Sequence, residues 1–382
     1  MKATLSYEQK EFVRSLRRLF ADECPPSLVR ELQNPAANPK PASLWRQLTK
    51  VGVFELALSE VSEDGGTLFD LGLVYEEGGR ALCPTIVYTT IELGLALFRF
   101  APASKWLPRV AAGEVLATSA LADAGDSSNT TPSLRAERHG SKWLLCGFLD
   151  FVPNADAADV LLTTARVQDR SGVPSVLAFL IPREAIKAQR RLTFARDTQC
   201  RVDLNGVQID RTHVLAEGVG LKQEDLHWVA NATTALHCMD MAGGAQAVID
   251  RTVTFLKDRH QFGRPIASFQ AAQHHIANMH IAVEGARLAA YSAVSLLGKN
   301  RTAERETAIA KLKANEAYKF VTLTAHQLHG GMGFMREFDL HLWSERAKAM
   351  ELRHGAWDTQ IRRIASELTE RRREEWVSHQ AP

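Results

Sequence analysis

The sequence contains little cysteine, and the five cysteines that it has are scattered along the chain. They form no Cys-x-x-Cys pair, so their spacing predicts neither a disulfide framework nor a zinc site. Charge of one sign is also scarce: 46 Lys and Arg residues stand against 44 Asp and Glu residues and leave a formal net charge of +2. This balance gives no indication that nucleic acid or a membrane surface is a partner.

Long apolar runs are missing as well. No stretch approaches the ~18 uninterrupted apolar residues of a membrane-spanning helix. Residues 1–12, MKATLSYEQKEF, lack the apolar core of a signal peptide, so we expect a cytoplasmic, enzyme-like chain. Apolar residues are nevertheless plentiful, at 45% of 382 residues, which is enough for the cores of two or three domains.

The first part of the chain has helical periodicity. Ser6 and Gln9 have the spacing of a capping box, and apolar residues then recur at helical intervals. Further helices are predicted at 43–66, with a break at Gly52, and at 68–84 and 88–100. We expect a helical domain over residues 1–112.

Short β-rich runs follow. They are separated by turn pairs such as His139-Gly140 and Asn205-Gly206. The runs are expected at 134–138, 143–146, 160–166, 175–181 and 202–209. Their regular spacing favours a β-barrel or sandwich domain over residues 113–222.

Helical periodicity returns over residues 223–382. The runs 268–297 and 303–328 are too long for average globular helices, which favours a four-helix bundle of long antiparallel helices. The Ala242-Gly243-Gly244 step predicts that another helix approaches closely at this point.

Residues 258–270, DRHQFGRPIASFQ, carry the first chemical motif. The guanidinium of Arg259 suits a pyrophosphate, since it is permanently charged and forks onto phosphate oxygens. Phe262 offers an apolar face, and Gln270 offers an amide. The alternative is that Arg259 makes a surface ion pair at a helix end and that Phe262 is ordinary core.

Residues 327–334, QLHGGMGF, carry the second motif. The adjacent Gly330 and Gly331 let a backbone approach a ligand closely and expose N–H groups to it, and Gln327 is a further candidate. The alternative is that this Gly-Gly pair only ends a helix.

Both motifs, and the order of helices, β domain and helix bundle, resemble the acyl-CoA dehydrogenase family over nearly the whole chain. The LW…G…SEVSEDGG and EEGGR stretches also resemble its helical N-terminal domain. The resemblance implies that Arg259, Phe262, Gln270, Gln327, Gly330 and Gly331 reach into a neighbouring subunit and hold the adenosine diphosphate end of FAD.

The family's catalytic glutamate is missing. By resemblance it would precede the glycine of a loop near the C-terminus, where this chain has His354 before Gly355, or lie on the first long bundle helix, where this chain has Thr233. Neither is a carboxylate, so no catalytic residue is predicted. One alternative is that His354 is itself the base, since imidazole titrates near neutrality.

The positions that by resemblance contact a subunit's own flavin ring and thioester are also altered. Phe151-Val152-Pro153-Asn154 stands where the family has Trp-Ile-Thr-Asn, and Pro153 has neither a hydroxyl nor a backbone N–H. The thioester loop falls on residues 122–129 and has lost its first hydroxyl. A Thr-x-Gln pair falls on Ala356 and Asp358, whose charge would repel a flavin phosphate.

This pattern resembles one chain of the actinobacterial heteromeric (α2β2) acyl-CoA dehydrogenases. The resemblance implies a chain that is inactive alone and that completes the FAD site of a homologous partner carrying the catalytic glutamate. It also implies a bulky substrate such as a steroid side-chain acyl-CoA, and an electron-transferring flavoprotein as acceptor. Two alternatives remain: a self-sufficient homotetrameric flavoenzyme using a base such as His354, and a non-enzymatic scaffold. No metal site is predicted, the His274-His275 pair included.

Overall fold

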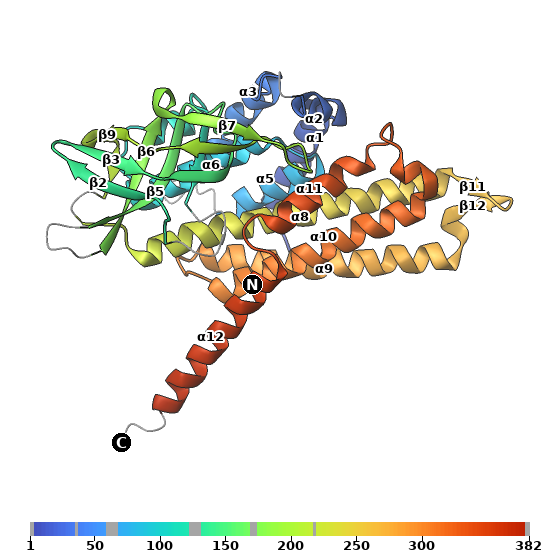
Figure 1. Cartoon of the computed structure of the whole chain (residues 1–382). Coiled ribbons are helices and arrows are strands. Elements are labelled where there is room, and N and C mark those ends of the chain that lie inside the picture. Colours follow the sequence, from blue (N-terminus) through green and yellow to red (C-terminus); the bar gives the residue numbers. More distant parts are fainter. Residues whose placement is uncertain are drawn as a thin grey trace.

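The structure is a computed structural model that describes residues 4–34, 37–58, 68–121, 131–168, 174–216 and 219–378. Helices, β sheets and again helices follow one another along the chain, and Figure 1 shows the β region at one end of a body of long helices. This is the acyl-CoA dehydrogenase-like architecture that the sequence predicts.

The N-terminal region is helical. Ser6 makes the predicted capping box with Gln9, since its hydroxyl accepts from the Gln9 N–H and the Gln9 side chain accepts from the Ser6 N–H. The helices are α1 (Tyr7–Glu23), α2 (Pro26–Leu32), α3 (Ala42–Lys50), α4 (Val53–Leu56), α5 (Leu68–Arg80), α6 (Thr85–Phe100) and α7 (Leu107–Ala111). The predicted break at Gly52 is confirmed, because this residue has φ 72° between α3 and α4. The pair Gly65-Gly66 lies outside the described residues.

The middle region contains two sheets over one apolar core. The strands are β1 (Ala117–Ala120), β2 (Arg135–His139), β3 (Lys142–Cys146), β4 (Phe148–Pro153), β5 (Val160–Gln168), β6 (Pro174–Pro182), β7 (Lys187–Arg191), β8 (Gln199–Asp203), β9 (Val207–Asp210) and β10 (Val214–Leu215). The larger sheet has the order β10-β6-β5-β2-β3-β9, with β1 also pairing with β5, and the smaller has the order β4-β8-β7.

One expected β run is wrong as a single element. Residues 202–209 belong to two strands, because the chain turns at Asn205-Gly206 and passes from the smaller sheet to the larger. Gly206 has φ +74°, which this turn requires. The strands β1, β4, β7 and β10 were not predicted, since they are short or lack a clear alternation of apolar and polar residues.

The C-terminal region is a bundle of long helices. Its elements are α8 (Gln223–Asp258), the hairpin β11 (His260–Gln261) and β12 (Arg264–Pro265), α9 (Gln270–Leu297), α10 (Glu304–His329), the 3-10 turn η4 (Gly330–Phe334), α11 (Leu340–Leu352) and α12 (Trp357–Ser378). In Figure 1, α12 points away from the rest of the molecule. The expected domain boundaries after residues 112 and 222 lie in the connections before β1 and α8, and they stay a prediction. Among the described residues, no helix combines the length and the apolar character needed to cross a membrane.

Helix α5 crosses α8 at the predicted glycine step. A Cβ atom added to Gly243 would lie 1.8 Å from the carbonyl oxygen of Glu76, and one added to Gly79 would lie 2.0 Å from that of Asp240. Both distances are far below van der Waals contact, so only glycine permits this separation of the two helices. The crossing joins the N-terminal helices to the bundle.

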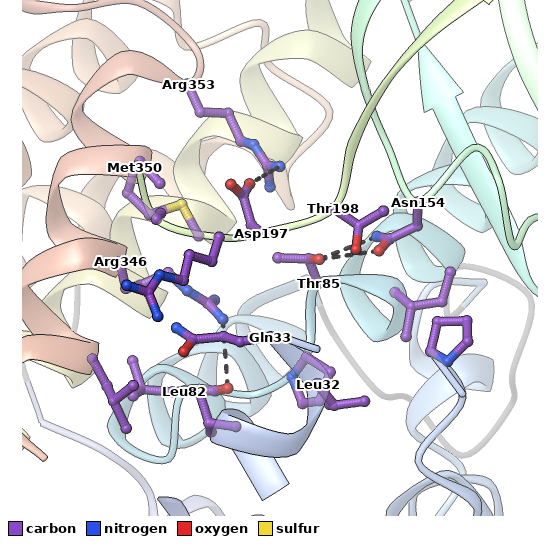
Figure 2. Close-up of a pocket in the computed structure, with 18 residues that line it drawn as sticks. Leu32, Gln33, Leu82, Thr85, Asn154, Asp197, Thr198, Arg346, Met350 and Arg353 are labelled. Carbon is purple, nitrogen blue, oxygen red and sulfur yellow. Dashed lines mark hydrogen bonds and ion pairs between the residues drawn. The ribbon is translucent and has the colours of Figure 1, made fainter. Parts of the chain in front are cut away.

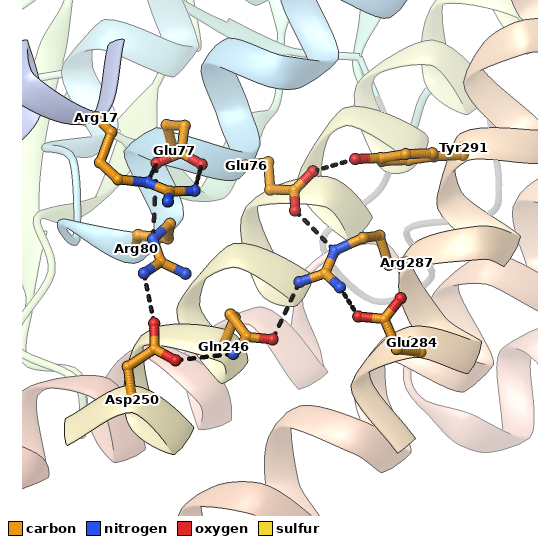
Figure 3. Close-up of polar contacts among 9 residues, drawn as sticks. All are labelled: Arg17, Glu76, Glu77, Arg80, Gln246, Asp250, Glu284, Arg287 and Tyr291. Carbon is orange, nitrogen blue, oxygen red and sulfur yellow. Dashed lines mark hydrogen bonds and ion pairs between the residues drawn. The ribbon is translucent and has the colours of Figure 1, made fainter. Parts of the chain in front are cut away.

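A polar network reinforces the same junction (Figure 3). Arg17 of α1 forms a two-point ion pair with Glu77 of α5, at 2.9 and 2.7 Å. Glu76 accepts hydrogen bonds from Arg287 and Tyr291 of α9, each at 2.8 Å. Since these groups satisfy one another, the EEGGR stretch has a structural role in holding α1, α5 and α9 together.

Candidate functional site

The two positions where the family keeps its base converge in space. His354 lies in the loop between α11 and α12 with φ +59°, and Thr233 lies buried on α8. His237, one turn further along α8, stacks its ring on that of His354, with centroids 4.8 Å apart and an interplanar angle of 28°. An imidazole from the chain itself therefore occupies the space beside the base position.

A buried carboxylate completes this cluster. Glu92 of α6 lies 2.7 Å from Nε2 of His237 (Oε1 to Nε2). The aromatic rings of Tyr75 and Tyr88 pack edge-on against the same imidazole, with centroids 5.6 and 5.7 Å away. We name Glu92, His237 and His354 the Glu-His-His cluster.

Burial disfavours the charged form of each group in this cluster. Burial raises the pKa of Glu92 to about 7, and burial lowers the pKa of His237 well below its usual value. Burial, followed by the neighbouring His237, also lowers the pKa of His354. Nδ1 of His237 and Nε2 of His354 have no hydrogen-bond partner among the described residues. Near neutral pH this arrangement favours two neutral imidazoles, and it shifts Glu92 toward the protonated carboxyl.

The loop that carries His354 is held by one amide and one amine, from the side chains of Gln360 and Lys311. Gln360 donates to the carbonyl oxygens of His354 and Gly355, at 2.8 and 3.2 Å. The buried ammonium of Lys311 donates to the Met350 carbonyl at the end of α11, at 2.6 Å, and burial lowers its pKa to about 8. The loop is thus held in one conformation.

Sequence reasoning missed Glu92, His237 and Lys311. One signal was visible for Glu92, which is an acidic residue inside the mainly apolar run YTTIELGLALF; the runs around His237 and Lys311 contain other polar residues and gave no such signal. A buried acid or amine in such a run needs a partner, and each of the three has one.

A small pocket lies between the stretches that, by resemblance, flank a flavin ring (Figure 2). Asn154 stands on one side, from the loop after β4, and Arg353 on another, directly before His354. Its volume is about 90 Å³, well below the ~300–1,000 Å³ of pockets that enclose organic ligands. Neither His354 nor His237 lines it.

The residues here do not fit a flavin ring. Pro153 ends β4 without an N–H to donate, and its carbonyl accepts from Thr118. The side-chain amide of Asn154 already donates a hydrogen bond to the Thr85 hydroxyl, at 3.1 Å. Asp358 is exposed and pairs with Arg362 at 3.1 Å. The thioester loop, residues 122–129, lies outside the described residues.

The six predicted cofactor residues lie elsewhere, at the far end of the bundle. Figure 1 places the β11–β12 hairpin and the adjoining ends of α8 and α9 there, away from the sheets. Phe255, one turn before Arg259, stacks on His329, the residue before Gly330, with ring centroids 4.3 Å apart. This contact brings the two motifs together, although about 60 residues separate them in the sequence.

At this end of the bundle the predicted cofactor-binding side chains are exposed. Phe262 is 91% exposed, so the ordinary-core interpretation is wrong for it. Arg259 is exposed and makes no ion pair with any residue that the structure describes, so a surface ion pair is not seen either. Gln270 and Gln327 are exposed too.

Gly330 ends α10, as the alternative interpretation of the Gly-Gly pair expects, since its N–H donates to the Gln327 carbonyl. Open space nevertheless surrounds both glycines, because a Cβ atom added to Gly330 or Gly331 would meet no atom within 4 Å. A permanent cation, an aromatic face and two open glycines fit the adenosine diphosphate half of FAD.

No cluster of metal-binding side chains occurs in the ranges that the structure describes. His274 and His275 are exposed on α9. The cysteines are free, and four of them are buried.

Comparison with known protein families shows matches to two domains of one family. Residues 6–114 match the N-terminal domain of acyl-CoA dehydrogenase, and residues 227–369 match the C-terminal domain. The chain belongs to the acyl-CoA dehydrogenase family, flavoprotein oxidoreductases that act on CH–CH bonds.

Three similar proteins within this family align over most of the chain. The acyl-CoA dehydrogenase IpdE2 of Mycolicibacterium smegmatis is 28% identical over 366 residues, which cover 94% of this chain and 99% of that protein. The mitochondrial short-chain specific acyl-CoA dehydrogenase of Rattus norvegicus is 27% identical over 349 residues, covering 86% of this chain and 82% of its own. A solved variant of the Tcur3481-Tcur3483 steroid ACAD is 26% identical, with a TM-score of 0.83, and covers 96% of this chain and 99% of that one.

Proposed function

We propose that this chain is the non-catalytic subunit of a heteromeric FAD-dependent acyl-CoA dehydrogenase. In the proposed α2β2 assembly, it holds the adenosine diphosphate end of an FAD whose ring lies in a homologous partner. The partner supplies the catalytic glutamate and binds the acyl-CoA substrate. Bound FAD supplies the hydride acceptor for the α,β-dehydrogenation.

The observation that carries this proposal is a contrast within one chain. The base position is filled by the Glu-His-His cluster, while the far end of the bundle presents Arg259 without an ion-pair partner among the described residues and Phe262 exposed. A subunit that used its own flavin would need a carboxylate at its base position, with open space beside it for the substrate.

The outer residues support a role toward a neighbour. Arg259 needs a counter-charge that the described part of this chain does not provide, and a diphosphate supplies one that matches its fork geometry. Phe262 has φ +54°, which turns its ring outward beside Gly263 rather than into the bundle. Both features suit a ligand shared across an interface.

The substrate class rests on relatives rather than on a residue of this chain. The similar Tcur3481-Tcur3483 protein is a steroid ACAD, and we propose a bulky acyl-CoA as the substrate here, such as a steroid side-chain thioester. An electron-transferring flavoprotein is the proposed acceptor.

Flavin stoichiometry tests the assembly directly. We expect the chain expressed alone to be insoluble or poor in flavin. Co-purification with its partner from the native host should give a complex with about one FAD per two chains, measured by absorbance after denaturation against protein concentration. One tightly bound FAD per chain in a homotetramer would overturn the proposal.

One observation favours a second candidate, a self-sufficient enzyme. Glu92 and His237 pair beside His354, and such a carboxylate–imidazole arrangement is used elsewhere to orient a base. The pocket nearby is not lined by His354, however, so a substrate carbon has no described path to it. Dehydrogenation of an acyl-CoA by the purified single chain, abolished by His354→Ala, would support this candidate.

A further inference from the structure

The small pocket of Figure 2 has two chemically different walls. One wall is apolar and comes from α2, α6, α11 and the turn before α6. Its members include Leu32, Leu82, Ile86, Leu342 and Met350. The other wall is polar and is formed by Arg196, Asp197, Thr198, Arg346 and Arg353. A ligand that fits both walls needs a short apolar body and a polar head.

The polar wall carries an excess of positive charge. Arg353 pairs with Asp197, with Nη2 and Oδ2 3.8 Å apart. Burial is the largest single influence on Arg346 and opposes its charge, but the neighbouring acidic groups, Asp240 first among them, together outweigh burial and raise the pKa of this guanidinium. Arg196, at the exposed rim, forms no ion pair within the described chain segments. Three guanidinium groups thus face two carboxylates, which favours a ligand with a single negative charge.

The wall also contains a donor that the described residues do not satisfy. Nη2 of Arg346 donates to the carbonyl oxygens of Leu82 and Cys83, at 3.5 and 3.1 Å, and these contacts fix the guanidinium. Its Nη1 is shielded from solvent and has no acceptor among the residues that the structure covers. A shielded charged donor without an acceptor is costly, so an acceptor from a ligand is expected to bind there.

From these features we propose that the pocket binds a small monocarboxylic acid. The carboxylate accepts from Nη1 of Arg346 and faces Arg353, and a short aliphatic body lies against Leu82 and Met350. A volume of about 90 Å³ limits this body to a few carbon atoms. The site requires no flavin, so it is independent of the proposed shared FAD.

Titration calorimetry with butyrate tests this proposal. The full chain is used in the form in which it purifies, alone or with its partner, at fixed ionic strength. We expect one butyrate per copy of this chain, and at least tenfold weaker binding of butyramide, which has the same shape without the charge. Equal binding of butyrate and butyramide would overturn the proposal, as would saturable binding of inorganic phosphate without binding of butyrate.

Variants locate the site. Arg353→Gln and Arg346→Lys should each weaken butyrate binding at least tenfold, the second because an ammonium cannot reproduce the fork of a guanidinium. Arg196→Gln at the exposed rim should weaken it a few-fold and leaves the buried contacts intact, so it decides the outcome if a buried variant fails to fold. Arg301→Gln, an exposed arginine between α9 and α10, is the matched control and should bind as the wild type does. Unchanged affinity in both Arg196→Gln and Arg353→Gln would overturn the assignment.

Discussion

The far end of the helix bundle and the interior around His354 treat their polar groups in opposite ways. At the far end, Arg259, Gln270 and Gln327 are exposed, and no hydrogen bond or ion pair satisfies their side chains within the described residues. In the interior, Glu92 and Lys311 are buried and held by internal partners.

This difference separates binding from folding. Buried polar groups must be satisfied by the chain itself, because water is not available to them. Exposed polar groups can hydrogen-bond to water, so they need no partner from the chain and can bind a ligand. The exposed groups at the bundle end are therefore the ones that the proposed function assigns to the shared FAD, while Glu92 and Lys311 stabilise the fold.

The largest effect is expected where α5 crosses α8. Gly243→Ala places a Cβ atom 1.8 Å from the Glu76 carbonyl oxygen, so the helices must separate and the free energy of unfolding should fall by roughly 3 kcal/mol or more. Gly285→Ala is the matched control, since nothing lies within 4 Å of its Cβ position on α9, and it should stabilise by up to ~1 kcal/mol. Thermal unfolding of the two variants gives the comparison, and similar midpoints would contradict this account of the crossing.

The interior cluster predicts a pH dependence. The pKa of Glu92 in the folded chain, about 7, lies above its ordinary value of 4.5. The folded state therefore favours the protonated carboxyl, and this contribution to stability is complete below pH 4.5 and is lost as the pH rises to 7, by roughly 3 kcal/mol. Glu92→Gln stays neutral, so its stability relative to wild type should rise by that amount over the same range.

Unfolding midpoints at a series of pH values measure this difference. Glu316→Gln is the control, because Glu316 is exposed on α10 and pairs with Lys313 at 3.0 Å. Parallel pH profiles for Glu92→Gln and the wild type would show that Glu92 is not a protonated buried acid.

A substitution at the bundle end should weaken binding of the cofactor. Arg259→Ala removes a charged donor and should weaken FAD binding by the complex about thirtyfold, that is, by roughly 2 kcal/mol. Arg301→Ala, at the other end of α9, should leave the flavin content unchanged. Flavin fluorescence after dialysis of the two complexes distinguishes them. A complex that keeps its FAD in Arg259→Ala would favour the scaffold alternative.

The smallest effect is expected at His354. His354→Ala should change the turnover of the complex less than twofold, because the partner supplies the base in the proposed assembly. His354→Glu should not create activity in this chain, since His237 and Pro153 still leave no room and no donors for a flavin and substrate. A tenfold loss in His354→Ala, measured with the same acyl-CoA, would sink the non-catalytic assignment.

Local sequence patterns were enough to predict much of the fold. Helical periodicity predicted α9 and α10 to within two residues at each end, and the glycine step at 243 predicted a close crossing that the structure confirms. The split of 202–209 between two sheets was beyond local reasoning, because which sheet a strand joins depends on partners distant in sequence.

The sequence by itself determined the family, the order of the three regions and the absence of a glutamate at position 354, since each depends on residues that are neighbours in the chain or on a recognisable motif. Only the tertiary structure decided what fills the base position. Glu92, His237 and His354 come from α6, α8 and a loop, so no spacing relates them. Their contact depends on how two helices and this loop pack, and packing is decided by the whole core rather than by any one stretch.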